Sequence, residues 1–342
     1  MTKMIHVDNL STNQLGYKQA VDFLNKGEVV AFPTETVYGL GAIATNESAV
    51  AKIFEAKGRP QDNPLIVHIA ERDSLNEFIA FIPELAKECM DAFWPGALTI
   101  ILPLKPGVLA RNVTAGLQSV GVRMPDHPVA LELLKQLKQP VAAPSANKSG
   151  KPSPTKASHV LNDLEGKIPL ILDGGITGLG LESTVIDFTL ETPTILRPGG
   201  VTKEMLEKVI GNVNEAKLTD SAAVPKAPGM KYAHYAPEAP VYLIEASEEK
   251  IAEAITTIHK ENKKVALIAT EQYVNKHADS FFTLGDSLDM ANAAHLLYEA
   301  LRSCDQTDVD IVLIPVFPEH GIGKAIMNRL EKAANGNWFT GE

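Results

Sequence analysis

Cysteines and long apolar runs are scarce in this chain of 342 residues, and their scarcity excludes several classes of protein. Only two cysteines occur, Cys89 and Cys304, and they lie far apart. A disulfide framework or a zinc site built on paired cysteines is therefore excluded, which suits a reducing, cytoplasmic setting. No run of about 18 apolar residues occurs, so neither a membrane span nor a membrane partner is expected.

Basic charge is also in deficit, which limits the partners that the chain can bind. The sequence holds 32 basic and 42 acidic residues, a net charge of −10. This balance argues against a protein that coats nucleic acid nonspecifically. Residues 1–210 carry only −3 and residues 240–342 carry −7. The first part is therefore the better candidate for binding an anionic ligand, and the length favours roughly two domains.

The common nucleotide and hydrolase motifs are missing. A P-loop requires G-x-x-x-x-G-K-[ST], and the nearest stretch has Pro318 in place of the first glycine and Ala325 in place of the Ser or Thr. Neither H-E-x-x-H nor G-x-S-x-G occurs. Most hydrolase and metalloenzyme classes lose their support, and no metal site made of protein ligands is predicted.

What is present is an alternation of short apolar runs and helical patterns. Strands are expected at residues 29–32, 65–69, 98–102, 120–123, 141–143, 170–172, 184–188, 241–244, 265–269 and 311–316. Helices are expected at residues 48–57, 129–137, 202–210, 247–260, 290–302 and 323–334. This pattern predicts an α/β or α+β domain on a twisted, open, mixed sheet, followed by a smaller, Rossmann-like α/β domain.

The domain boundaries follow from a change in composition. Residues 1–210 form the predicted first domain and residues 241–342 the second. Residues 211–240 between them contain four prolines and few periodic apolar positions, so they are predicted to be a linker. Loops of nearly 30 residues are usually functional or disordered. The stretch KYAHYAP inside this linker is too aromatic for an inert spacer.

Cations and hydroxyl groups gather near the ends of the predicted strands of the first domain. Lys57 and Arg59 flank Gly58 at a helix end, where they would either cap the helix or clamp a phosphate. Arg123 inside an apolar strand is costly unless it meets an anion. The loop at residues 144–153 is either a solvated loop or a phosphate cradle. The cations concerned are Lys57, Arg59, Arg123, Lys148, Lys151 and Arg197. Together they suggest a site for a highly charged anion such as a nucleoside triphosphate.

Six motifs in order also carry a resemblance to a known family. They are PTETVYGLG, KGRPQDNPL with VHI, SVGVRMPDHP, APSANKSGKPSPT, LESTVIDF and ILRPGG. They resemble the YrdC-type domain of threonylcarbamoyl-AMP synthase over about residues 15–210. The linker motif APGMKYAHYAP and the second domain resemble the longer, two-domain form of that family. The resemblance covers almost the whole chain.

The resemblance implies an activity and its partners. The family joins L-threonine, bicarbonate and ATP into threonylcarbamoyl-AMP with release of diphosphate. The product passes to a tRNA threonylcarbamoyl transferase complex, which modifies the adenosine beside the anticodon. Mg²⁺ is expected with ATP, held by phosphates and water. The linker is expected to cover the active site. Apart from the resemblance, the protein is expected to be a cytoplasmic monomer. Direct contact with tRNA or double-stranded RNA stays open.

The same resemblance implies a role for individual residues. Threonine would lie near Thr36, His68, Arg123, Ala143 and Ser183. ATP would contact Arg59, Asn63, Ser119, Ser145, Asn147, Ser153 and Arg197, with either His234 or Tyr235 from the linker. Lys57 and Arg59 would be the catalytic cations. Taken without the resemblance, His68 in the apolar run LIVHIA is better explained as a core histidine, and only the resemblance favours a ligand role.

Two other functions compete with the synthase. The first is an RNA-binding module, although the charge of residues 1–210 and the lack of a basic, aromatic sheet motif weigh against it. The second is a regulatory protein that senses a nucleotide. Pyrophosphate release that requires ATP, threonine and bicarbonate together would distinguish the synthase from both.

Overall fold

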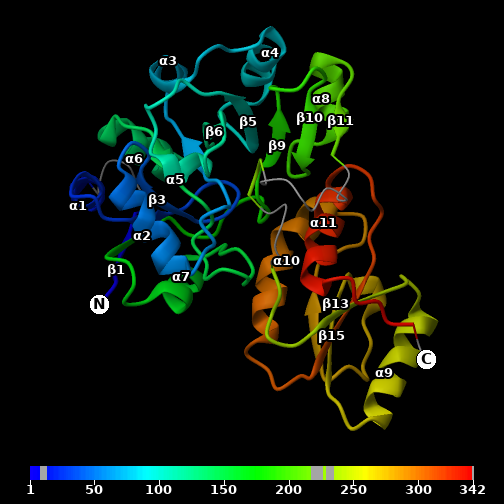
Figure 1. Ribbon diagram of the computed structural model, residues 1–342. Helices are drawn as coiled ribbons and strands as arrows, with labels where there is room; N and C mark the ends of the chain where they lie inside the picture. The colour runs from blue at the N-terminus through cyan, green and yellow to red at the C-terminus, as the bar shows by residue number, and fades with distance from the viewer. Residues whose placement is uncertain (8–13, 217–225, 229–234, 341–342) are drawn as a thin grey trace. The chain divides into compact units, whose positions relative to one another are not determined.

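The computed structural model describes residues 1–7, 14–216, 226–228 and 235–340. The chain divides into two compact α/β units (Figure 1). Met1–Ser149, Pro154–Gly178 and Glu182–Lys231 make up the first unit. Gly150–Ser153, Leu179–Leu181 and Tyr232–Glu342 make up the second. Two short segments inside the predicted first domain are thus grouped with the second unit.

The first unit is built on a mixed sheet, within the described residues. Its strands are β1 (Lys3–His6), β2 (Val30–Phe32), β3 (Gly39–Ile43), β4 (Ile66–His68), β5 (Leu98–Pro103), β6 (Ser119–Arg123), β7 (Val141–Ala142), β8 (Leu170–Asp173), β9 (Thr184–Asp187), β10 (Thr194–Arg197) and β11 (Asn214–Glu215). Their order is β1-β8-β2-β3-β7-β4-β6-β5-β9-β10-β11. β4 runs parallel to β6 and antiparallel to β7. The predicted open, mixed sheet is confirmed.

Helices cover both faces of this sheet. They are α1 (Gln14–Asn25), α2 (Glu47–Lys57), α3 (Leu75–Phe78), α4 (Glu84–Phe93), α5 (Arg111–Thr114), α6 (Pro128–Leu137), α7 (Ala157–Leu164) and α8 (Lys203–Ile210), with a 3-10 turn at Arg72–Ser74. Residues of α1 and α6 share one apolar core with β2 and β8, whereas α2, α4, α7 and α8 contribute to another. The sheet between the two cores is therefore protected on both sides.

The ends of α2 show how local sequence places two candidate cations. The side chain of Asn46 caps the N-terminus by accepting a hydrogen bond from the amide of Ala49. The helix stops because Gly58 adopts a left-handed conformation at φ 63°, which glycine reaches without strain. Lys57 is therefore the last helical residue, and Arg59 begins the loop that follows.

β3 occupies a stretch that is not among the strands expected from the sequence. Gly39 pairs with Phe32 and Gly41 with Val30 in the antiparallel ladder of β2 and β3. A Cβ atom at Gly41 would lie 2.7 Å from a ring carbon of Phe32. Glycine here permits the close approach of packed side chains, which is why a search for apolar runs does not identify this strand.

The second unit holds a four-stranded parallel sheet in the described part of the chain. Its elements are β12 (Val241–Ile244), α9 (Glu248–Lys260), β13 (Val265–Ala269), a 3-10 turn (Glu271–Tyr273), β14 (Ser280–Thr283), α10 (Met290–Cys304), β15 (Ile311–Pro315) and α11 (Ile322–Ala334). The strand order is β12-β15-β13-β14 with every pair parallel. The predicted smaller Rossmann-like fold is confirmed. Among the described residues, no helix is long and apolar enough to span a membrane.

Contacts within the second unit explain why it includes residues 150–153. Arg302 of α10 is buried and donates a hydrogen bond to the carbonyl of Pro152. The amide of Ala236 donates to the carbonyl of Gly150 at 3.2 Å. Lys151 also lies 3.5 Å from a carboxylate oxygen of Asp305. These residues belong with α10 although they are distant from it in sequence.

Candidate functional site

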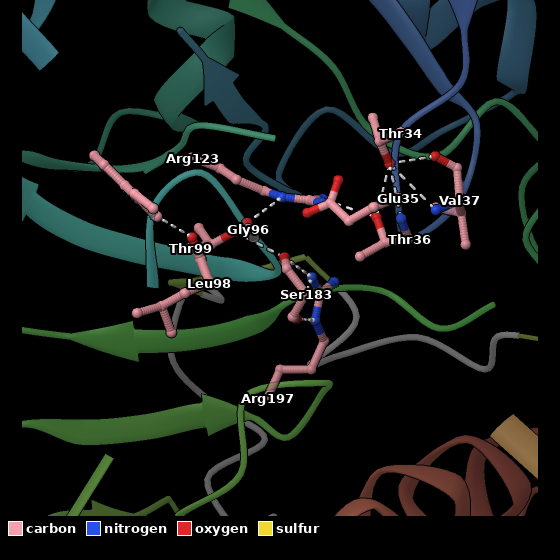
Figure 2. A network of polar contacts seen from close by, with 11 residues as sticks. Thr34, Glu35, Thr36, Val37, Gly96, Leu98, Thr99, Arg123, Ser183 and Arg197 are labelled. Carbon is pink, nitrogen blue, oxygen red and sulfur yellow. Dashed lines mark hydrogen bonds and ion pairs between the residues drawn. The ribbon is translucent and has the colours of Figure 1, made fainter. Parts of the chain in front are cut away.

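A buried arginine lies at the centre of the first unit's polar site. The register of β4 and β6 pairs His68 with Arg123, and the residue Arg123 is only 4% exposed. Its Nη1 donates to the hydroxyl of Thr36 at 2.8 Å, and its Nε donates to the carbonyl of Gly96 at 3.2 Å (Figure 2). The guanidinium is therefore held in one orientation by groups far apart in the sequence.

The loop after β2 is folded around Thr34. The Thr34 hydroxyl donates to the carbonyl of Val37 at 2.7 Å and accepts from the amides of Thr36 and Val37. It also lies 2.8 Å from the Thr36 hydroxyl. This compact turn leaves the side chains of Glu35 and Thr36 pointing toward Arg123 (Figure 2). The loop is thus prearranged for polar contacts rather than a solvated turn.

Glu35 is a site residue that sequence reasoning missed. Its Oε1 lies 2.6 Å from Nη2 of Arg123, and its side chain is 18% exposed. The glutamate stands in the quoted motif PTETVYGLG, but the sequence pattern assigns it no role. The sequence offered one signal for such a role, because Glu35 lies between two hydroxyl residues just after a buried strand. Only the fold shows which cation it meets.

His68 is a buried, neutral histidine. Burial, and after it the positive charge of Arg123, lowers the pKa of His68 to about 3. Its Nδ1 lies 3.2 Å from the carbonyl of Ile66, and its ring meets Phe32 edge-on at 6.3 Å. The imidazole is therefore both a core residue and a neighbour of Arg123, so the two interpretations of the sequence describe the same position.

A second arginine holds Ser183. Arg197 at the end of β10 donates through Nε and Nη2 to the carbonyl of Ser183, at 3.1 and 3.0 Å, and through Nη2 to its hydroxyl. The Ser183 hydroxyl also lies 2.8 Å from that of Thr99. Arg197 Nη1 donates to the carbonyl of Pro228. Ser183 and Arg197, predicted to serve different substrates, are thus in direct contact (Figure 2).

Lys57 binds the loop that follows β7. Its ammonium group donates to the carbonyls of Ser145 and Asn147, and at 3.3 Å to the Asn147 side chain. The Ser145 hydroxyl also donates to the Asn147 amide oxygen. A bridge between Gly39 and Ser145 ties this loop to the start of β3. Lys57 is buried, and its contacts hold this loop in place.

Arg59 and Asn63 form a separate buried pair. Nη2 of Arg59 donates to the carbonyl of Pro64 at 3.1 Å, and both Nε and Nη2 lie 3.4 Å from the carbonyl of Asn63. Both residues are at least nine-tenths buried. The side-chain oxygen of Asn63 accepts no hydrogen bond from the described residues. It is therefore a buried acceptor without a donor in the described part of the chain.

Three further predicted residues lie in or next to the strands and loops of the chain. Ala143 follows β7 and donates its amide to the carbonyl of Ile66, and Ser119 opens β6 opposite Pro103. Ser153 is fully buried and belongs to the second unit.

Of the two linker residues expected to contact ATP, Tyr235 is among the described residues and His234 is not. Tyr235 is buried in the second unit, where it stacks on Tyr298 at 5.3 Å and lies 5.8 Å from the guanidinium carbon of Arg329. Its φ of 70° is unusual for a residue with a side chain.

Groups of acidic, histidine or cysteine side chains that could hold a metal ion are absent from the described residues. The fold and site therefore define an α/β protein whose first unit carries a buried site rich in arginine and hydroxyl groups. The chemistry available there is recognition of anions by fixed guanidinium groups.

Known proteins share both units. A Sua5, YciO and YrdC family model, described as telomere recombination, matches residues 22–199, and a model described as threonylcarbamoyl-AMP synthase, C-terminal domain, matches residues 201–335. The threonylcarbamoyl-AMP synthase of Bacillus subtilis is 53% identical over 96% of both chains. That of Pyrococcus abyssi is 50% identical over 92% of this chain and 93% of its own.

Solved structures agree with these sequence relatives. The structure of P. abyssi Sua5 complexed with L-threonine matches with a TM-score of 0.93 and 47% identity over 99% of both chains. Escherichia coli YciO matches with a TM-score of 0.52 and 28% identity, over 58% of this chain and 96% of its own. The chain belongs to the threonylcarbamoyl-AMP synthase family, in the form with two domains. The predicted family, fold class and enzyme activity are confirmed.

Proposed function

We propose that the protein joins L-threonine, bicarbonate and ATP into threonylcarbamoyl-AMP, and that Arg123 binds the carboxylate of threonine. The observation that carries this assignment is the fixed guanidinium of Arg123, with the Thr36 hydroxyl at 2.8 Å. A planar carboxylate matches an arginine fork, and burial strengthens the interaction. The threonine-bound relative from P. abyssi supports the same ligand. His68 and Ser183 would complete the threonine site beside the backbone of Ala143.

ATP would bind through the residues that the family motifs assign to it. These are Arg59, Asn63, Ser119, Ser145, Asn147, Ser153 and Arg197. The contacts of Lys57 with the carbonyls of Ser145 and Asn147 support a role in holding this loop in shape for the nucleotide. Contact of His234 or Tyr235 with ATP, and closure by the linker, stay predictions.

The reaction needs no covalent intermediate with the protein. The threonine amine adds to bicarbonate and forms a carbamate with loss of water. A carbamate oxygen then attacks the α-phosphorus in line, and diphosphate leaves. Fixed cations would stabilise the charge that develops, and orientation of the reactants can contribute roughly 7–11 kcal/mol.

Mg²⁺ enters this scheme as part of the nucleotide substrate. The described residues offer no cluster of acidic, histidine or cysteine ligands for it. Phosphate oxygens and water are the ligands that Mg²⁺ ordinarily keeps in such sites. We therefore propose MgATP as the form that binds, and a tRNA threonylcarbamoyl transferase complex as the consumer of the product.

Pyrophosphate release tests the proposal. Purified protein is incubated with MgATP, L-threonine and bicarbonate, and each substrate is left out in turn. Release that requires all three supports the proposed reaction. Release without threonine, or none at all under any condition, contradicts it. Salt-sensitive RNA binding without release would favour the RNA-binding module, and tight ATP binding without release would favour the sensor.

A further inference from the structure

The carboxylate of Glu35 is the one acidic group in direct contact with Arg123 among the described residues, and its contacts are incomplete. Nη2 of Arg123 lies 2.6 Å from Oε1 of Glu35. Neither Glu35 oxygen accepts a hydrogen bond within the described part of the chain, and both are shielded from solvent. Buried ion pairs that serve only stability normally satisfy their remaining lone pairs. Glu35 is therefore a buried acceptor that still lacks a donor.

Arg123 and Glu35 place a positive and a negative charge side by side. This arrangement matches the carboxylate and the adjacent ammonium group of a free amino acid. If the threonine carboxylate binds Arg123, it brings a second negative charge beside Glu35, and like charges at this range repel. The α-ammonium group of the same molecule offsets that repulsion because it lies next to the carboxylate. A zwitterion can thus satisfy both side chains, whereas a simple carboxylate can satisfy only Arg123.

We propose that Glu35 binds the α-ammonium group of threonine and accepts the proton that this nitrogen must lose. The inference rests on the proposed function, in which threonine binds at Arg123. One N–H bond breaks and one O–H bond forms, so the ammonium becomes a neutral amine and Glu35 a neutral carboxylic acid. The amine lone pair then attacks the carbon of bicarbonate, and water leaves as the carbamate forms.

The surroundings of Glu35 suit this role. Among the described residues, two titratable or charged groups interact with Glu35. They are Arg123 on β6 and His127 at the N-cap of α6. Burial lowers the pKa of His127, although the carboxylates of Glu35 and Asp126 act in the opposite direction. The nearby imidazole of His68 is neutral because its pKa is about 3. Proton transfer to Glu35 therefore meets no competing histidinium ion above about pH 7.

The test is the pH dependence of Glu35→Gln. The glutamine keeps the shape of the side chain but can neither form an ion pair with an ammonium group nor accept its proton. At pH 7 and saturating ATP, kcat/KM for threonine should fall at least 100-fold, within the range ascribed to general bases. The deficit should shrink to 10-fold or less at pH 9.5, because more threonine then arrives as the free amine. The KM for ATP should change less than twofold.

Glu28→Gln is the matched control. Glu28 also forms an ion pair at 2.6 Å, with Lys52, but both side chains are 39% exposed on the surface of the same unit. Its kcat/KM should stay within twofold of the natural protein at every pH. A deficit of Glu35→Gln that is equal at pH 7 and pH 9.5, or below threefold at pH 7, overturns the proposal.

Binding measurements distinguish this proposal from the proposed function. Calorimetry compares threonine with 2,3-dihydroxybutanoate, which has a hydroxyl in place of the amine. The natural protein should prefer threonine at least 30-fold, and Glu35→Gln should lose most of that preference. An equal preference in both proteins overturns the role of Glu35. Failure of the natural protein to bind threonine at all overturns the proposed function instead.

Glu35→Asp covers the case in which Glu35→Gln fails to fold, as judged by circular dichroism. Aspartate keeps the charge but moves the carboxylate back by about one methylene. Its kcat/KM should fall while the shape of its pH profile stays that of the natural protein. A profile of Glu35→Asp that rises with pH would contradict the assignment, because the base would still be present.

Discussion

His68 and Arg123 are neighbours in the register of β4 and β6, and this pairing adds to the effect of burial in keeping His68 neutral. Arg123 is a buried cation held by Thr36 and Gly96. Burial and the nearby guanidinium together lower the pKa of His68 to about 3. A second positive charge beside Arg123 is thus avoided in the site. The same pairing makes the stability of the first unit depend on pH.

The variant His68→Asn should flatten that dependence. The unfolded chain binds a proton at His68 near pH 6.5, but the folded chain does so only near pH 3. His68 therefore stabilises the fold fully above pH 6.5, and this contribution is lost as pH falls toward 3. Between pH 6 and 4 the natural protein should lose about 1.4 kcal/mol per pH unit more than His68→Asn.

Urea unfolding of the first unit at several pH values measures this difference. His127, whose pKa is also lowered by burial, is present in both proteins and so cancels in the comparison. His277→Asn is the control, because His277 lies exposed on the surface and its removal should leave the slope unchanged. Equal slopes for the natural protein and His68→Asn would show that His68 is not held neutral.

Lys57→Met should destabilise the first unit because it removes a buried donor. The carbonyls of Ser145 and Asn147 would lose a charged hydrogen bond, at a cost of about 1.5–3 kcal/mol. Lys52→Met, on the same helix and in an exposed pair with Glu28, should cost less than about 1 kcal/mol. Chemical denaturation measures the free energy of unfolding of both variants. Equal losses would show that the buried contacts of Lys57 stabilise the fold no more than the exposed pair of Lys52 does.

Gly41→Ala should disturb the packing beside the site. A Cβ atom there would lie 2.7 Å from side-chain carbons of Phe32 and Val141. Overpacking of this kind typically costs about 1–3 kcal/mol. Gly39→Ala is the control, since a Cβ at Gly39 meets its nearest neighbour, Ala143, at 3.4 Å. Thermal unfolding should show a clear drop in Tm for Gly41→Ala only; a drop of the same size in both would contradict the steric explanation.

Arg302→Met should loosen residues 150–153 in the second unit. The carbonyl of Pro152 would lose its buried donor, a loss of about 1–3 kcal/mol. Hydrogen exchange should show faster exchange at the amides of Lys151 and Ser153. Lys250→Met, an exposed residue of α9, should leave both exchange and Tm unchanged. Unchanged exchange in Arg302→Met would show that this segment does not depend on Arg302.

The apolar strands of both sheets could be predicted because each is a short hydrophobic run. Residues 98–102 and 265–269 are fully buried on both faces, so their composition alone identifies them. β3 could not be predicted in this way, because glycine in a strand is explained only by the side chains packed against it. α1 carries Tyr17, Ala20 and Leu24 at helical spacing. This helix is not among those expected above, although its pattern could have been predicted from the sequence.

The sequence by itself determined the chemistry of this protein: the ordered motifs, the hydroxyl groups and the arginines in an acidic chain. Only the tertiary structure decided which of these groups meet. Thr36 and Arg123 are separated by 87 positions, and their hydrogen bond depends on the order and register of strands in a mixed sheet. Pairing between distant strands is a non-local property, so no local pattern specifies it. For the same reason Glu35 gained a role only when the fold placed it beside Arg123.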